Sequence, residues 1–248
     1  MATLERMRTT DRIGRWAHGY ARERRVVDGG PTRWQLPASD LVELETFVEG
    51  GLVELFESGS FRLAGPPTHQ RDYAPPSGGA HMDDPRRRLV QLQAFGELVT
   101  QHGWPASRIV LDDGVDLMGL GADHEVRVAC ETRATHEEGR ELLDRLNDDG
   151  PLGDAERSKL RARLHGLRPE ALWIVAPGVR AAFRFHPDGD AGKPTLTRTI
   201  ALPAALDGRL ECPACGAEDL WGMRLTSDGR ITLMCNVCEE RWSRNPRC

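Results

Sequence analysis

The sequence predicts an α/β protein, with a mixed sheet flanked by helices, a small α+β domain at its N-terminus and a cysteine-built module at its C-terminus. Three observations predict this organisation. Helix-type and strand-type hydrophobic patterns alternate through the middle of the chain, a stretch rich in proline and glycine precedes them, and two Cys-x-x-Cys pairs follow. We therefore expect units at residues 1–65, 89–202 and 203–248, with a linker at 66–88.

The first unit combines helical and strand patterns. Thr10-Asp11 has the residue types of a helix cap, and apolar residues recur at helical spacing after it. A second helix is expected from about residue 37 until Gly50-Gly51 ends it, and residues 52–63 then read as strand, turn and strand. This order resembles a winged-helix module. A small α/β packing or dimerisation domain is the alternative.

The middle unit alternates between the two periodicities. Apolar residues at helical spacing predict helices over 86–102, 136–147 and 154–166. Runs of strand-forming residues predict strands over 108–111, 115–118, 125–133, 171–175, 179–185 and 196–202. The order is therefore helix, three strands, two helices and three strands, and it indicates a mixed sheet.

Four cysteines near the C-terminus have the spacing of a metal site. Cys212 and Cys215 form one Cys-x-x-Cys pair, and Cys235 and Cys238 form a second. One tight turn can aim both sulfurs of such a pair at a single point, which is typical of a structural zinc site with four thiolates. A hairpin pattern with an Asp-Gly turn joins the pairs, so residues 208–244 resemble a zinc ribbon. Two disulfides or free thiols are the alternative.

Two acidic residues of the middle unit carry a second resemblance. Asp116 lies in the expected second strand, and Glu131-Thr132-Arg133 ends the third. With the element order above and with Glu97 on the preceding helix, this segment resembles the PD-(D/E)xK nuclease-like superfamily, found in restriction enzymes. The resemblance covers residues 87–202 and implies a restriction-endonuclease-like fold.

The resemblance also implies a chemistry. Strand side chains alternate, so Glu131 and Arg133 share a face beside Asp116 on the neighbouring strand. Asp116 and Glu131 would hold Mg²⁺, which prefers oxygen ligands, and Glu97 would complete its shell. A metal-bound water would then attack a phosphodiester. The catalytic set implied by the resemblance is Asp116, Glu131, Arg133 and Glu97.

Arg133 departs from the family pattern, which has lysine at this place. Arginine stays protonated and cannot exchange a proton, although it can hold a phosphate oxygen. Three readings therefore stay open. The middle unit is a Mg²⁺-dependent DNA endonuclease, a catalytically degenerate relative that binds nucleic acid or a protein partner, or an unrelated α/β domain with two surface acids.

Composition limits the partners. Net charge is −5, and no segment is a polycation, so tight nonspecific binding to phosphates is not expected. A local arginine face on the ribbon would have to make any such contact. The residues that we consider for it are Arg224, Arg230, Arg241 and Trp242.

The expected setting follows from the same features. No run of about eighteen apolar residues occurs, so no membrane span is expected. The charged N-terminus is unlike a secretory signal, and zinc-type cysteines favour a reducing cytoplasm. We expect DNA as the partner, with RNA or a protein of a multi-subunit system as alternatives, and a role in restriction or phage defence.

Overall fold

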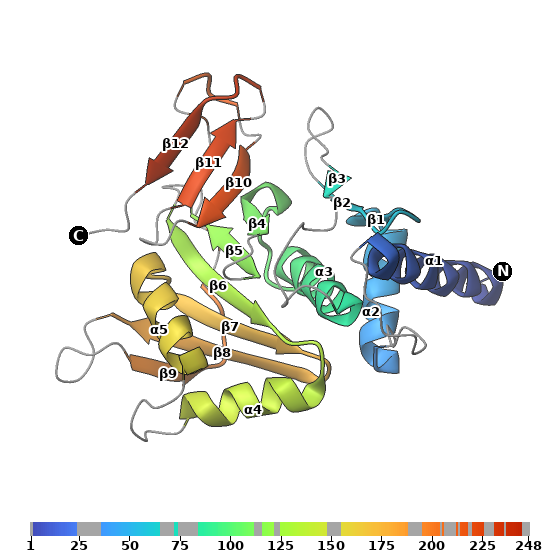
Figure 1. Ribbon diagram of the computed structural model, residues 1–248, viewed down its shortest axis with the longest axis horizontal. Helices are drawn as coiled ribbons and strands as arrows, with labels where there is room; N and C mark the ends of the chain where they lie inside the picture. Colours follow the sequence, from blue (N-terminus) through green and yellow to red (C-terminus); the bar gives the residue numbers. More distant parts are fainter. Residues whose placement is uncertain are drawn as a thin grey trace.

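The computed structural model arranges the chain around one mixed six-stranded sheet, with an α+β unit on one side and a small separate sheet beside one edge (Figure 1). The structure describes residues 2–23, 36–64, 72–73, 84–111, 116–121, 125–147, 155–187, 195–203, 205, 212, 214–217, 220–225, 231–235 and 237–244. Its helices are α1 (Ala2–Glu23), α2 (Ala38–Glu49), α3 (Pro85–Thr100), α4 (His136–Asn147) and α5 (Ala155–Leu167). None of the helices described is both long and apolar enough to span a bilayer.

The central sheet has the strand order β4-β5-β6-β7-β8-β9. The strands β4 to β6 form an antiparallel meander, β6 pairs parallel with β7, and the remaining neighbours are antiparallel. A parallel pair needs a crossover connection, and α4 and α5 supply it. The strands are β4 (Ile109–Leu111), β5 (Leu117–Leu120), β6 (Val126–Thr132), β7 (Ala171–Ala176), β8 (Val179–His186) and β9 (Thr195–Thr199).

Alternation along the central strands builds two cores on opposite faces of this sheet. Leu172 and Ile174 of β7 pack in a cluster with the apolar residues of α4 and α5. Trp173 and Val175, on the other face, pack in a cluster with α3. The sheet is therefore covered on both faces, which explains why β7 reads as an uninterrupted apolar run in the sequence.

The N-terminal unit shares the second of these cores. It consists of α1, α2 and an antiparallel sheet of β1 (Val53–Leu55), β2 (Phe61–Leu63) and β3 (Asp72–Tyr73). Its apolar side chains form one continuous cluster with α3 and the central sheet. The helices α2 and α3 approach closely, since a Cβ added at Gly96 would lie 2.1 Å from the Phe47 ring. Within the expected linker 66–88, the described residues form β3 and the first turn of α3.

The C-terminal module is a three-stranded antiparallel sheet. Its strands are β10 (Leu220–Leu225), β11 (Ile231–Cys235) and β12 (Arg241–Arg244), and β10 contacts the edge strand β4 of the central sheet. The hairpin of β10 and β11 agrees with the expected pattern, and the turn expected at 227–230 lies outside the described residues. The third strand, β12, was not expected.

Two expected element ends are wrong. The helix α1 begins at Ala2, so Thr10-Asp11 lies inside it, because the preceding residues are mostly good helix formers. The strand β5 begins at Leu117, so Asp116 lies just before the strand rather than within it. The carboxylate of Asp116 accepts a hydrogen bond from the backbone N–H of Thr132, at 2.5 Å, across the end of the sheet.

Gly19 provides a test of how α1 packs. Its backbone lies against the turn between β1 and β2, and an added Cβ would be 2.0 Å from the carbonyl oxygen of Glu57. Alanine is favoured over glycine inside helices by about 1 kcal/mol, so Gly19→Ala would ordinarily stabilise α1. We predict instead that it lowers the free energy of unfolding by about 1–3 kcal/mol, measured by denaturant titration. His18→Ala on the exposed face is the control, and stabilisation by Gly19→Ala would contradict this packing.

Candidate functional site

The two acids singled out in the sequence lie side by side at one end of the central sheet. Pairing of Leu117 with Cys130 places Asp116, just before β5, next to Glu131 of β6. Asp116 is 3% exposed and Glu131 is 5% exposed. These are therefore buried carboxylates rather than surface acids, and buried charges require partners.

Arg87 of α3 lies between the two carboxylates. Its Nη2 is 3.2 Å from each oxygen of Asp116 and 3.8 Å from Oε1 of Glu131. One nitrogen therefore contacts both acids. The side chain of Arg87 is 18% exposed, so the cluster approaches solvent on the side of this guanidinium.

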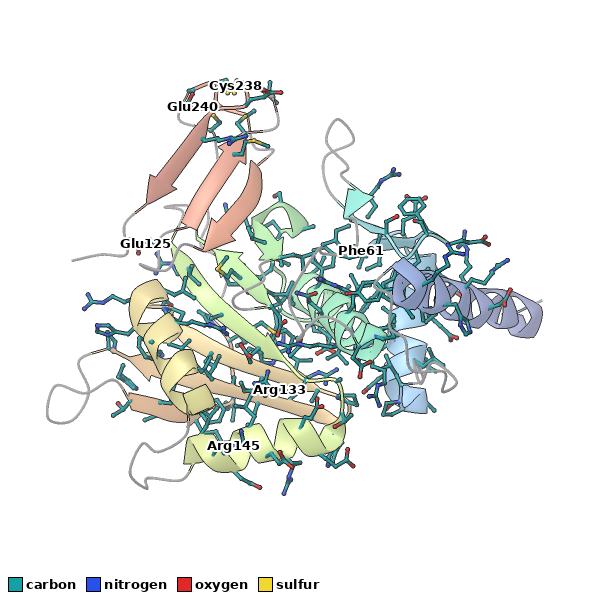
Figure 2. The ribbon with its side chains drawn as sticks, in the orientation of Figure 1. Phe61, Glu125, Arg133, Arg145, Cys238 and Glu240 are labelled. Atoms are coloured by element: carbon teal, nitrogen blue, oxygen red, sulfur yellow. The ribbon has the colours of Figure 1, made fainter. Side chains whose placement is uncertain are left out.

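Arg133 supplies a second cation to Glu131, at the same carboxylate oxygen that Arg87 approaches. Its Nη1 donates to Oε1 of Glu131 at 2.7 Å and to the carbonyl oxygen of Thr132 at 2.8 Å. Its backbone N–H donates to the carbonyl oxygen of Val175 at 2.9 Å, which extends the parallel pairing of β6 and β7 by one bond. Arg133 lies at the end of β6, beside the start of α4 (Figure 2).

The acid pair is also linked to α3 through the backbone. The side-chain amide of Gln91 donates to the carbonyl oxygen of Asp116, and Arg88 donates to Oε1 of Gln91. The N-terminus of α3 is capped by Asp84, whose Oδ1 accepts from the N–H of Arg86 at 2.8 Å. These bonds hold the first two turns of α3 against the end of the sheet. We name Asp116, Glu131, Arg87 and Arg133 the acid–arginine cluster.

Glu131 is the electrostatically strained member of this cluster. Burial and the charge of Asp116 raise the pKa of its carboxyl, while Arg133 and Arg87 act in the opposite direction. Its Oε2 is buried and has no hydrogen-bond partner among the described residues. A carboxylate oxygen in that state favours a proton or a further cation.

Glu97 lies apart from this cluster. It is ten residues beyond Arg87 on α3, about 15 Å along the helix axis. Both of its oxygens accept from Nε of Arg180 on β8, at 3.0 and 2.7 Å. Burial raises the pKa of Glu97, and the Arg180 ion pair lowers it in part. The structure therefore brings together Asp116, Glu131 and Arg133 of the expected catalytic set, and pairs Glu97 elsewhere.

The sequence analysis missed Arg87, Gln91 and Arg180. Arg87 belongs both to the expected linker 66–88 and to the expected helix 86–102, and neither expectation assigns it a partner. The available signal was Asp84-Pro85, since an Asp cap followed by proline marks the start of a helix. This signal supports the expected helix over 86–102, which already has Arg87 in its first turn, but it does not place Arg87 against the two acids.

The donor set in this cluster does not fit Mg²⁺. The ion binds oxygen at about 2.0–2.1 Å and retains several waters, so it needs open space between its carboxylates. Arg87 lies in that space, with one nitrogen within 4 Å of both acids. The cluster is a network of salt bridges, and we derive no metal-dependent step from it.

The four cysteines meet at the tip of the C-terminal sheet. All four Sγ atoms lie within 4.8 Å of one another, with Cys212–Cys238 at 3.6 Å and Cys215–Cys235 at 3.5 Å. A tetrahedron with Zn–S bonds of about 2.3 Å has edges of about 3.8 Å. A disulfide would need about 2.05 Å, and these cysteines are free. The cluster therefore fits zinc, and disulfide pairing is excluded for these four residues.

The two Cys-x-x-Cys turns have the same backbone design. The N–H of Ala214 donates to Sγ of Cys212, and the N–H of Val237 donates to Sγ of Cys235, each at 3.4 Å. The residues after the second cysteines, Gly216 and Glu239, both have positive φ, at 71° and 60°. The repeated design aims both pairs of sulfurs at one centre, as a four-thiolate site requires.

The pKa values of the Cys235 and Cys238 thiols are shifted in opposite directions at this centre. Burial opposes ionisation of Cys235, but the N–H groups of Cys238 and Val237 outweigh it and lower its pKa to about 7. The pKa of Cys238 is lowered by the N–H of Glu240, and raised, to about 12 overall, chiefly by desolvation and the neighbouring thiols. A bound dication would favour the thiolate at every position.

The ribbon and the acid–arginine cluster lie at opposite ends of β6 (Figure 2). Glu125 precedes β6 on the ribbon side, Arg133 follows its other end, and Cys238 lies at the tip of the ribbon. The seven residues of β6 span about 23 Å. Of the expected nucleic-acid contacts, Arg241 is exposed on β12, Arg224 lies in β10, Trp242 lies in β12, and Arg230 lies outside the described residues.

The chain was compared with family models, with curated proteins and with solved structures. No family model, no curated protein and no solved structure matches the chain.

Removing one thiolate tests the zinc assignment. We predict that the purified wild type contains zinc, and that Cys212→Ser loses it because three ligands cannot close the tetrahedral site. The C-terminal sheet then unfolds, since a module of this size depends on its metal. Metal analysis and hydrogen exchange measure both effects. Cys130→Ala, at a buried cysteine of β6, is the control and retains zinc. Folded wild type without zinc would contradict the assignment.

Glu131 predicts a pH dependence of stability. Its pKa is raised in the folded state, so folding favours the protonated form. Stability is then lost as the pH rises from about 4, the ordinary value, through the folded pKa. We predict that the free energy of unfolding of the wild type, relative to Glu131→Gln, falls over this window. The exposed Glu141→Gln is the control. The prediction is contradicted if the difference in free energy of unfolding between the wild type and Glu131→Gln stays constant or increases with pH.

Proposed function

We propose that this chain is a zinc-dependent nucleic-acid-binding adaptor, built on a nuclease-like core that does not hydrolyse its ligand. The element order helix, three strands, two helices and a strand that pairs parallel with the third supports the nuclease-like resemblance. So does the placement of Asp116 beside Glu131, with Arg133 two residues after Glu131. The chain would be a degenerate member of the PD-(D/E)xK type.

One observation carries the non-catalytic half of the proposal. The guanidinium of Arg87 lies between Asp116 and Glu131, where the chemistry implied by the resemblance requires a metal. With Arg133 on Glu131 as well, two carboxylates face two guanidinium groups. Such a cluster holds elements of the fold together, and its two arginines stay protonated and cannot act as a base towards a water.

The binding half of the proposal rests on the ribbon. Zinc ribbons serve as rigid supports for recognition, and the cysteine tip of this one lies away from the central sheet (Figure 2). Arg241 is exposed on its outer strand β12. Because net charge is −5, the affinity for phosphates must come from such local positions rather than from bulk charge.

The alternative is a Mg²⁺-dependent DNA endonuclease, as in restriction or phage defence. The closeness of Asp116, Glu131 and Arg133 favours it, and it would require Arg87 to leave its position. A protein partner in a multi-subunit system is the other alternative, because ribbons also bind proteins.

Binding and hydrolysis are measured together on labelled duplex DNA and on RNA. We predict no cleavage by the zinc-loaded wild type with Mg²⁺ or Mn²⁺, and DNA binding that weakens as salt rises. Arg241→Glu should weaken binding and lower the salt slope by about one counterion or more. Arg140→Glu, exposed on α4, is the matched control.

Three outcomes would decide against the proposal. Cleavage that disappears in Asp116→Ala and Glu131→Ala would establish the endonuclease. Binding of RNA but not DNA would contradict the predicted DNA binding and would identify RNA as the ligand. Binding of neither would remove the nucleic-acid role and leave the protein-partner alternative.

A further inference from the structure

We infer that the guanidinium of Arg87 is a built-in substitute for a metal ion, and that removing it converts the acid–arginine cluster into a divalent-cation site. This inference concerns the ion chemistry of Asp116 and Glu131. It does not depend on whether the chain binds nucleic acid.

The geometry of Arg87 is that of a bridging cation. A single atom, Nη2, lies 3.2 Å from both oxygens of Asp116 and 3.8 Å from Oε1 of Glu131. A metal ion bound by the carboxylates of Asp116 and Glu131 would likewise be a single positive charge centre in contact with both carboxylates. The two cannot be accommodated together, because the guanidinium fills the space that a hydrated ion needs.

Arg87 is fixed in this place by its helix. It lies in the first turn of α3, which begins at Pro85 and is capped by Asp84. One turn further along, Gln91 donates to the carbonyl oxygen of Asp116. The first two turns of α3 therefore contact Asp116 through both Gln91 and Arg87, and this holds the guanidinium in its position.

Charge balance explains why a metal is excluded while Arg87 is present. Two carboxylates and two guanidinium groups already give a neutral cluster when both acids are ionised. A further dication would leave two uncompensated positive charges beside Asp116, Glu131 and Arg133, which are only 3% to 9% exposed. An unpaired buried charge is strongly unfavourable. Loss of Arg87 reverses the balance and leaves one excess negative charge.

Glu131 indicates where the new ion would bind. Its Oε2 is buried without a hydrogen-bond partner among the described residues. Its Oε1 is already shared by Arg133 and Arg87. When Arg87 is absent, Oε1 of Glu131 and the two oxygens of Asp116 lose the cation that they share, and Oε2 of Glu131 is a further oxygen donor of the kind that Mn²⁺ and Mg²⁺ accept.

The test is a Mn²⁺ titration of the zinc-loaded full chain, followed by the electron paramagnetic resonance signal of free Mn²⁺. The variant Arg87→Met keeps a long side chain without charge. We expect it to bind one Mn²⁺ with a dissociation constant about tenfold or more below that of any Mn²⁺ site in the wild type. Arg87→Met/Asp116→Asn should lose that ion. The matched control is Arg86→Met, whose guanidinium pairs with Asp84 and not with the two acids, and it should behave as the wild type does.

Two results overturn the inference. One is a wild-type Mn²⁺ site that disappears in Asp116→Asn, because Arg87 would then not exclude a metal. The other is folded Arg87→Met that binds no more Mn²⁺ than the wild type. If Arg87→Met does not fold with or without Mn²⁺, comparison of the wild type with Asp116→Asn decides. Equal Mn²⁺ binding by those two proteins supports exclusion by Arg87.

Discussion

The contact of one guanidinium with two buried carboxylates is the constraint on which the rest of the structure depends. Arg87 joins α3 to the ends of β5 and β6 through Asp116 and Glu131. On the face of the sheet beside it, α3 also completes the core shared with the N-terminal unit. The same ion pairs thus fix the position of the central helix and decide the chemistry of the site. Breaking a buried pair of this kind costs about 3–5 kcal/mol.

The four-cysteine cluster, which fits a zinc ion, is a second and separate site. It lies at the tip of the C-terminal sheet, while Glu131 and Arg133 of the acid–arginine cluster lie at the far end of β6, where Figure 2 labels Arg133. The ribbon meets the central sheet where β10 contacts the edge strand β4. A metal ion bound by the four cysteines can therefore order the C-terminal sheet without any change in the acid–arginine cluster. A macromolecular ligand that touched both sites would have to extend along the sheet.

Local pattern was enough to predict much of this fold. The bounds of α4, at 136–147, follow from its leucine spacing, and β7 follows from its apolar run. The cysteine turns are short-range features, and the meander places Asp116 beside Glu131. The partners of the acids were not predictable, because Arg87 meets Asp116 across 29 positions and Arg180 meets Glu97 across 83. Such pairs are set by tertiary packing, which sequence periodicity does not encode.

The most direct measurement is a crystal structure of the zinc-loaded chain grown in MnCl₂, with anomalous data collected at the manganese edge. Our account predicts that the Arg87 guanidinium lies between Asp116 and Glu131 and that no manganese peak occurs there. A manganese peak bridging the two carboxylates, with Arg87 turned away, would contradict it.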